Sequence, residues 1–216
     1  MKWLSRLLAR TPQPEPLTAD LLRRIRRSFE EAAADEEHFP SRIDPRIYHL
    51  RLILDAFGDL AGKRVLDIGC GKGRFARVLK EQHPGAAVVA LDLAEAMLRF
   101  VPPDIPPVAA SMTALPFGDG TFDAAYATES LEHAVDIPLA VAEMARVLKL
   151  GGRLVIIDKN ARQWGRLETP EWERWFRQEE LEGLLRRHCR RVSSRAISYW
   201  EDVKPDGLFL AWLAEK

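Results

Sequence analysis

Short apolar runs and helical stripes alternate along most of the chain. Apolar residues recur at helical spacing in three stretches and predict helices over residues 74–82, 95–100 and 137–148. Apolar runs rich in β-branched residues predict strands between them, at residues 64–67, 88–93, 108–110, 122–128 and 153–158. This alternation is typical of βαβ units, so it predicts an α/β fold with a doubly wound, mostly parallel sheet.

The end of the chain has a different pattern. A helix is predicted over residues 178–188, followed by alternating segments at 192–200 and 208–213. The Lys204-Pro-Asp-Gly207 sequence between these segments favours a turn, so they predict an antiparallel hairpin. With this C-terminal hairpin the predicted sheet has seven strands.

The first 43 residues are predicted to form a helical extension. Residues 1–10 carry one apolar stripe (Trp3, Leu4, Leu7 and Leu8), which favours packing on the chain itself or on a second copy over weak contact with a membrane surface. Residues 18–37 predict a helix with a charged face. Asp44 and Pro45 predict the N-cap and first turn of a helix over residues 44–57. The chain is therefore divided into a helical cap, 1–43, and a core domain, 44–216.

Length, charge and cysteine usage exclude several classes of protein. The 216 residues allow one α/β domain, and 32 basic against 32 acidic residues give no support to a nucleic-acid binder. Cys70 and Cys189 have no metal-ligand spacing, so a reducing cytoplasm is the expected compartment. No apolar run reaches the ~18 residues of a transmembrane segment, and the first ten residues lack the apolar stretch of a signal peptide.

A glycine-rich turn follows the first predicted strand. Gly69, Gly71 and Gly73 read GxGxG, and Arg74 stands where a dinucleotide fingerprint has its third glycine. Asp67 precedes the turn, where a carboxylate would repel a pyrophosphate and attract a cationic ligand. The loop therefore predicts a nucleotide-type site with a cationic ligand, and leaves another Rossmann-like nucleotide binder as the alternative.

Three segments resemble one family. Residues 65–73, Val-Leu-Asp-Ile-Gly-Cys-Gly-Lys-Gly, closely resemble motif I of class I S-adenosylmethionine (SAM) methyltransferases. Residues 111–123, Ser-Met-Thr-Ala-Leu-Pro-Phe-Gly-Asp-Gly-Thr-Phe-Asp, and residues 148–157 resemble later segments of that family. The resemblance covers residues ~62–158, is closest to the methyltransferase type 11 group, and implies a Rossmann-like methyltransferase fold that uses SAM.

The resemblance implies a SAM-binding role for particular positions. Asp92 ends the second strand, 21 positions after Gly71, where an acidic residue accepts hydrogen bonds from ribose hydroxyls or caps the next helix. Ser111 stands where the family usually has Asp, and Met112 would cover the adenine or lie in the core. The remaining predicted cofactor residues are Asp67, Gly69, Gly71, Gly73, Leu93 and Thr128.

Candidate catalytic residues follow the fourth strand, at the carboxyl edge where ligands bind. His133 is a candidate general base or a histidine packed behind the SAM loop, and Glu129 is a second catalytic candidate. Glu129, Glu132 and His133 stand at i, i+3 and i+4, so they share one face if the segment is helical. This pattern resembles the divalent-cation site of ubiquinone-pathway O-methyltransferases. A metal site is the less favoured alternative to a metal-free one.

Aromatic residues gather in residues 160–177, after the fifth strand. Trp164, Trp172, Trp175 and Phe176 predict either a lid over the acceptor pocket or anchors that hold a surface loop on the core. In the first interpretation the three tryptophans bind the methyl acceptor.

Together these features predict a cytoplasmic SAM-dependent methyltransferase. Its acceptor is expected to be a small molecule or a sugar- or lipid-linked metabolite, methylated on oxygen or nitrogen, with no nucleic-acid partner. A homodimer is an alternative to a monomer. The competing functions are an RNA methyltransferase, a non-catalytic SAM-binding protein and a nicotinamide enzyme.

Overall fold

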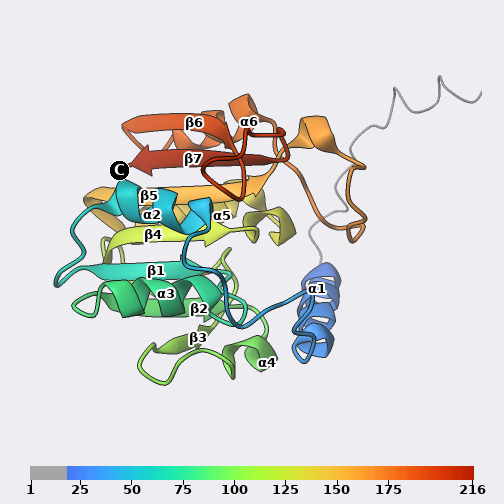
Figure 1. The fold of residues 1–216 in the computed structure, drawn as a ribbon, viewed down its shortest axis with the longest axis horizontal. Helices are drawn as coiled ribbons and strands as arrows, with labels where there is room; N and C mark the ends of the chain where they lie inside the picture. The colour runs from blue at the N-terminus through green and yellow to red at the C-terminus, as the bar shows by residue number, and fades with distance from the viewer. Residues whose placement is uncertain (1–18) are drawn as a thin grey trace, which may run out of the picture.

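The computed structural model describes residues 19–216, and it confirms the predicted seven-stranded sheet (Figure 1). The apolar stripe of residues 1–10 lies outside the described residues. The strands lie in the order β3-β2-β1-β4-β5-β7-β6, in which β7 runs antiparallel to both of its neighbours and the other neighbouring strands are parallel. Their bounds are β1 (Arg64–Ile68), β2 (Ala87–Asp92), β3 (Pro107–Ala109), β4 (Phe122–Thr128), β5 (Leu148–Lys159), β6 (Arg191–Ile197) and β7 (Phe209–Glu215).

Helices cover both faces of the sheet. They are α1 (Ala19–Ala32), α2 (Tyr48–Phe57), α3 (Arg74–Gln82), α4 (Glu95–Leu98), α5 (Ile137–Val147) and α6 (Gln178–Leu185), with the short 3-10 helices η1 (Leu131–His133) and η2 (Ala161–Gln163). One core cluster joins α5 and α6 to one face of the sheet, and a second joins α2 and α3 to the other. Within β1, Leu66 belongs to the first cluster and Val65 to the second. The parallel strands therefore read as continuous apolar runs, since both of their faces are buried.

Two helices differ from their predicted bounds because aspartate side chains form local turns. Asp44 does not cap a helix: its carboxylate accepts hydrogen bonds from the backbone N–H of Arg46, at 2.9 Å, and from that residue's guanidinium. The predicted helix over 44–57 therefore begins at Tyr48. Likewise, Asp35 Oδ1 accepts the backbone N–H groups of residues 37 and 38, so α1 ends at Ala32 and not at residue 37. Such side-chain bonds compete with helical ones.

Two further elements, α4 and β5, also differ from their predicted bounds. The helix predicted to begin at residue 95 ends at Leu98 and does not reach residue 100. The last parallel strand, β5, begins at Leu148 and not at Arg153, with Gly151 at φ 76° and an irregular register against β4.

The N-terminal segment lies at the carboxyl ends of β1, β2 and β4 (Figure 1). Leu21 and Ile25 are buried against Val135, and Phe29 packs beside Met97. Glu30 accepts the two backbone N–H groups that open α4, at 2.8 and 3.0 Å. The segment thus covers the edge of the sheet where ligands bind in such folds. Within residues 19–216, none of the helices combines the length and the apolar character needed to cross a bilayer.

Candidate functional site

A cavity of about 500 Å³ lies at the carboxyl ends of β1, β2 and β4. β1 is the point at which the order of the parallel strands reverses, and ligands bind at such switch points. The glycine loop after β1 lines one side of the cavity, and η1 with residues 167–173 lines another. The N-terminal segment completes the enclosure through α1 and residues 38–40.

The three loop glycines all have positive φ, but each is required for a different reason. Gly69, at φ 71°, lies against Ser130: an added Cβ would be 2.4 Å from the Ser130 Cβ. Gly73, at φ 74°, is the N-cap of α3, and an added Cβ would lie 3.1 Å from a Val101 methyl. Gly71, at φ 53°, faces open space within the cavity lining. Gly71 is therefore where a ligand can approach the backbone most closely.

Two carboxylates flank this loop, that of Asp67 buried and that of Asp92 half-buried. The hydroxyl of Tyr126 donates to Asp67 Oδ2 at 2.9 Å, and burial raises the pKa of Asp67 to about 7. Asp92 accepts the backbone N–H of Gly71 at 2.8 Å and that of Ala94 at 2.9 Å, and burial also raises its pKa. Asp92 thus fixes the conformation of the glycine loop and keeps its carboxylate at the cavity.

The segments after β2 and β3 supply a further wall. Leu93, which follows β2, and Ser111 and Met112, which follow β3, line the cavity. The Ser111 hydroxyl lies 2.7 Å from the Thr113 hydroxyl and accepts the backbone N–H of Thr113 at 3.2 Å, so its hydrogen-bonding capacity is largely used within its own turn. Met112 also packs against the core cluster of α5 and α6, so its two proposed roles are compatible.

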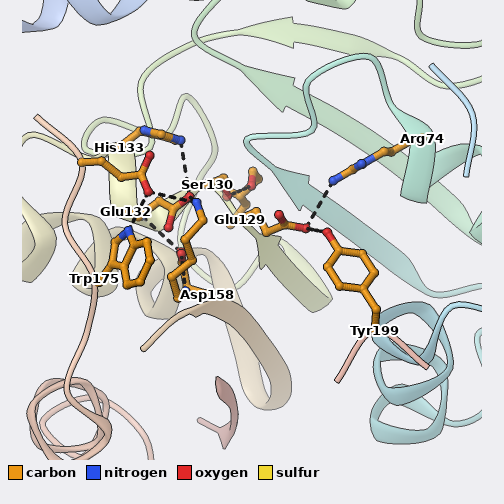
Figure 2. A network of polar contacts seen from close by, with 11 residues as sticks. Arg74, Glu129, Ser130, Glu132, His133, Asp158, Trp175 and Tyr199 are labelled. Carbon is orange, nitrogen blue, oxygen red and sulfur yellow. Dashed lines mark hydrogen bonds and ion pairs between the residues drawn. The ribbon is translucent and has the colours of Figure 1, made fainter. Parts of the chain in front are cut away.

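Glu129 lies apart from the other candidate catalytic residues (Figure 2). It is the one non-glycine residue with positive φ, 51°, among residues 19–216. Its Oε1 accepts hydrogen bonds from Arg74 at 3.3 Å and from the Tyr199 hydroxyl at 2.8 Å. Because η1 begins only at Leu131, the segment is not helical at Glu129, and the condition under which Glu129 would share one face with Glu132 and His133 is not met.

A buried charge cluster occupies the other side of the site. The Lys159 ammonium, at the end of β5, donates to Glu132 Oε1 and to Glu173 Oε1, the latter at 2.9 Å. The indole N–H of Trp175 also donates to Glu173 Oε1, at 2.7 Å. Asp158 accepts the backbone N–H groups of Glu132 and Lys159, at 3.1 and 2.9 Å. Lys159 and Glu173 were not among the predicted site residues.

The cluster changes the pKa values of its members. Burial, then the carboxylate of Asp158, raises the pKa of Glu132 well above its usual range, and burial raises that of Asp158 to about 6. Burial lowers the pKa of Lys159, but Glu132 and Glu173 raise it further, so its ammonium stays charged. Burial and the nearby Lys159 charge lower the pKa of His133 to about 3. The imidazole is therefore neutral at pH 7.

Four buried polar atoms of the cavity lining have no hydrogen-bond partner within the described chain. They are Thr128 Oγ1, Glu132 Oε2, His133 Nδ1 and Trp172 Nε1. Buried polar atoms are nearly always paired, so these four are available to a bound molecule.

The predicted lid contributes one of its tryptophans to the cavity. Trp172 lines it beside residues 167–170. Trp175 is buried behind this wall, and Trp164 packs edge-on against Trp175 with the ring centres 5.3 Å apart. Acceptor binding by the three tryptophans stays a prediction; the contacts favour it for Trp172.

Comparison with known proteins gives a consistent result. Residues 66–156 match a family model described as a methyltransferase domain. Demethylmenaquinone methyltransferase of Renibacterium salmoninarum is 38% identical over 122 residues, which are 55% of this chain and 51% of that protein. The same enzyme of Paenarthrobacter aurescens is 38% identical over 174 residues, 76% of this chain and 66% of that protein.

A solved structure has a similar fold. The Thermotoga maritima protein described as a SAM-dependent methyltransferase, possible histamine N-methyltransferase, aligns with a TM-score of 0.67 and 21% identity, covering 89% of this chain and 99% of that one. This chain spans about half the length of the R. salmoninarum relative.

Proposed function

We propose that the chain, whose residues 66–156 match a methyltransferase domain, is a class I SAM-dependent methyltransferase that transfers a methyl group from SAM to the oxygen of a small, largely apolar molecule. The observation that carries the proposal is the cavity itself. It joins a glycine loop and two carboxylates on one side to unpartnered polar atoms on the other.

The residues beside the glycine loop fit SAM. Gly71 leaves room for close approach, and the carboxylates of Asp67 and Asp92 suit a ligand that carries positive charge and ribose hydroxyls. Met112 and Leu93 offer apolar surface to an adenine ring. When bound, SAM supplies an electrophilic methyl group on a sulfonium.

The charge of the cavity favours an uncharged acceptor. Every basic side chain that lines it within residues 19–216 lies against a carboxylate: His38 against Asp35, Lys72 against Glu36, Arg74 against Glu129, His133 against Glu132, and Lys159 against Glu132 and Glu173. No cation in the described lining is left to bind a phosphate or a carboxylate. A phosphorylated sugar and an RNA backbone are therefore disfavoured as acceptors.

The unpartnered atoms favour oxygen over nitrogen as the methylated atom. Trp172 Nε1 is a donor only, so it requires an acceptor atom on the ligand, which a hydroxyl oxygen provides and an ammonium does not. A protonated amine would also be stabilised beside these carboxylates, and an ammonium has no lone pair to attack a methyl group. Leu22, Ile25 and Phe29 of α1 provide an apolar wall for the body of the acceptor.

His133 is proposed to orient the acceptor hydroxyl. Its Nε2 faces Glu132 Oε1 at 3.6 Å, which favours the tautomer with the proton on Nε2 and leaves Nδ1 as a hydrogen-bond acceptor. The neutral ring can then hold the hydroxyl with its oxygen lone pair turned toward the methyl donor. Glu132 would stabilise the imidazolium if the ring takes the proton during attack.

Two more specific proposals each rest on one observation. The buried free cysteines, Cys70 and Cys189, support a cytoplasmic location. The similarity to demethylmenaquinone methyltransferases supports a ring-bearing, quinone-like acceptor for this chain.

The proposal is tested with labelled SAM and a panel of acceptors. Simple phenols and hydroquinones with apolar substituents should be methylated on oxygen, whereas carboxylic acids, sugar phosphates, amines and RNA should not. The His133→Ala variant should bind SAM normally and lose turnover. Preferred methylation of amines or phosphorylated acceptors would contradict the assignment.

A further inference from the structure

The Lys159 ammonium contacts two members of a set of three potential metal ligands. Carboxylate oxygens of Glu132 and Glu173 and a ring nitrogen of His133 all lie within 4.8 Å of one another. Lys159 Nζ contacts both carboxylates, and its side chain is only 11% exposed. Two carboxylates and an imidazole are ligands that Mg²⁺, Mn²⁺ and Zn²⁺ accept. The charged end of a side chain therefore bridges two of the carboxylates that such an ion would bind.

We propose that Lys159 is a built-in replacement for a divalent cation in this site. The site has the ligands for an ion, and the protein supplies the positive charge itself from the last residue of β5. The inference concerns the charge cluster alone and does not rest on methyl transfer.

The charge balance of the cluster supports this role. The buried carboxylates of Glu132 and Glu173 contact the Lys159 ammonium, and the buried carboxylate of Asp158 accepts the backbone N–H groups of Glu132 and Lys159 beside them. Buried carboxylates without a counter-charge are strongly destabilising. The ammonium therefore provides the compensation that a bound ion provides in metal sites.

Hydrogen bonds and ion pairs do not satisfy every potential ligand atom of the cluster. Glu132 is 1% exposed, and its Oε2 has no partner within the described residues; the same is true of His133 Nδ1. Lys159 has a single charge on a long stem and cannot reach every ligand atom as a centrally bound ion would. The ammonium contacts Glu132 Oε1 and Glu173 Oε1 and makes no contact with Glu132 Oε2 or His133 Nδ1.

Lys159 also connects two segments that line the cavity, η1 and the loop between β5 and α6. Glu132 belongs to η1, whereas Glu173 belongs to the loop between β5 and α6. Backbone bonds run in parallel with the ion pairs: the N–H of Arg174 donates to the Glu132 carbonyl at 2.9 Å, and the N–H of Phe176 donates to the Lys159 carbonyl at 3.0 Å. Lys159 is thus a positioning residue that holds the loop carrying Trp172 on η1.

Removing the ammonium should convert the cluster into a metal site. After dialysis against a chelator, the wild type should take up no Mn²⁺ or Zn²⁺ at the cluster, and its melting temperature should not depend on either ion. Lys159→Ala should bind one ion per chain, at least about 10-fold more tightly than the wild type, and should melt higher when the ion is present. Calorimetry, elemental analysis and thermal melts measure these effects without any acceptor.

Matched variants identify the ligands. Lys159→Ala combined with Glu132→Gln should lose the acquired ion. Lys149→Ala, which removes a lysine at the other end of β5 that pairs with Asp123, should acquire none. Lys159→Met should also acquire none, because its side chain fills the space without leaving room for an ion.

Two results would overturn the proposal. One is a wild-type protein that binds a divalent ion and loses it in Glu132→Gln. The other is a folded Lys159→Ala protein that binds none. If Lys159→Ala does not fold with or without ions, Lys159→Met is compared with the double variant Lys159→Met/Glu132→Gln. Removing both charges should destabilise the protein less than removing the lysine charge alone. An equal or larger loss of stability in the double variant would contradict the role of Lys159 as counter-charge.

Discussion

Substitution of single glycines by alanine should separate the packing and binding roles of the cofactor loop. Gly62, Gly69 and Gly71 all have positive φ, 68°, 71° and 53°, so alanine at each carries a similar backbone cost of about 1–2 kcal/mol. They differ in what a methyl group would meet. Nothing lies within 4 Å at Gly62 and Gly71, whereas at Gly69 the Ser130 Cβ would lie at 2.4 Å.

The magnitudes follow from these surroundings. Gly62→Ala is the control, because this exposed turn is remote from the cavity lining. Gly69→Ala adds an overpacking cost of about 1–3 kcal/mol and should destabilise by about 2–5 kcal/mol in total. It should also disturb the bond from the Ser130 hydroxyl to the Ile68 carbonyl, 2.9 Å long. Gly71→Ala should unfold like the control yet bind SAM about 10- to 100-fold more weakly, since its methyl group enters the ligand space.

Urea unfolding and calorimetric titration with SAM measure the two effects separately. Equal stability of Gly69→Ala and Gly62→Ala would refute the packing argument. Unchanged SAM affinity in Gly71→Ala would refute the placement of the cofactor against this glycine.

Two further predictions concern the carboxylate beneath the loop and the tryptophans of the loop after β5. Because the pKa of Asp67 is raised to about 7, this carboxyl is protonated below about pH 7, and SAM affinity should fall by up to about tenfold per pH unit below that value. The Asp67→Asn variant should bind SAM weakly with little pH dependence. A flat pH profile of SAM affinity in the wild type would argue against an ionised Asp67 at the cofactor. Trp172→Phe should raise the acceptor KM with little change in melting temperature or SAM affinity. Trp175→Phe should lower the melting temperature, because it removes the 2.7 Å hydrogen bond to buried Glu173. The reverse pattern in steady-state kinetics and thermal melts would exchange the roles of the two tryptophans.

The positions of the glycine loop and of Asp92 could be predicted from sequence because their determinants are local, whereas SAM binding there stays a prediction. A strand, a glycine turn and a helix place Gly69 and Gly71, and the parallel pairing of β1 with β2 brings Asp92 to the same edge. The conserved geometry of a doubly wound sheet thus converts sequence spacing into position. Only the conformation of individual side chains, such as the Ser111 turn, needed the structure.

The acceptor side could not be predicted in the same way, because its contacts join distant segments. Lys159 meets Glu132 through the pairing of β4 with β5, and Glu173 reaches them from a loop whose path depends on backbone bonds to both. Helical spacing also does not hold at Glu129, whose positive φ turns its side chain toward Tyr199. Periodicity describes a regular element, and this segment is not one.

Calorimetric titration of SAM into the wild type and into Asp92→Ala tests the central claim most directly. Asp92 accepts two backbone N–H groups and faces the cavity, so its loss frees the Gly71 loop and removes the proposed partner of the ribose hydroxyls. We predict one SAM site per chain in the wild type, and binding weakened by about 1–3 kcal/mol in a variant that remains folded. Absence of SAM binding to the wild type, or equal affinity in the two proteins, would contradict the account.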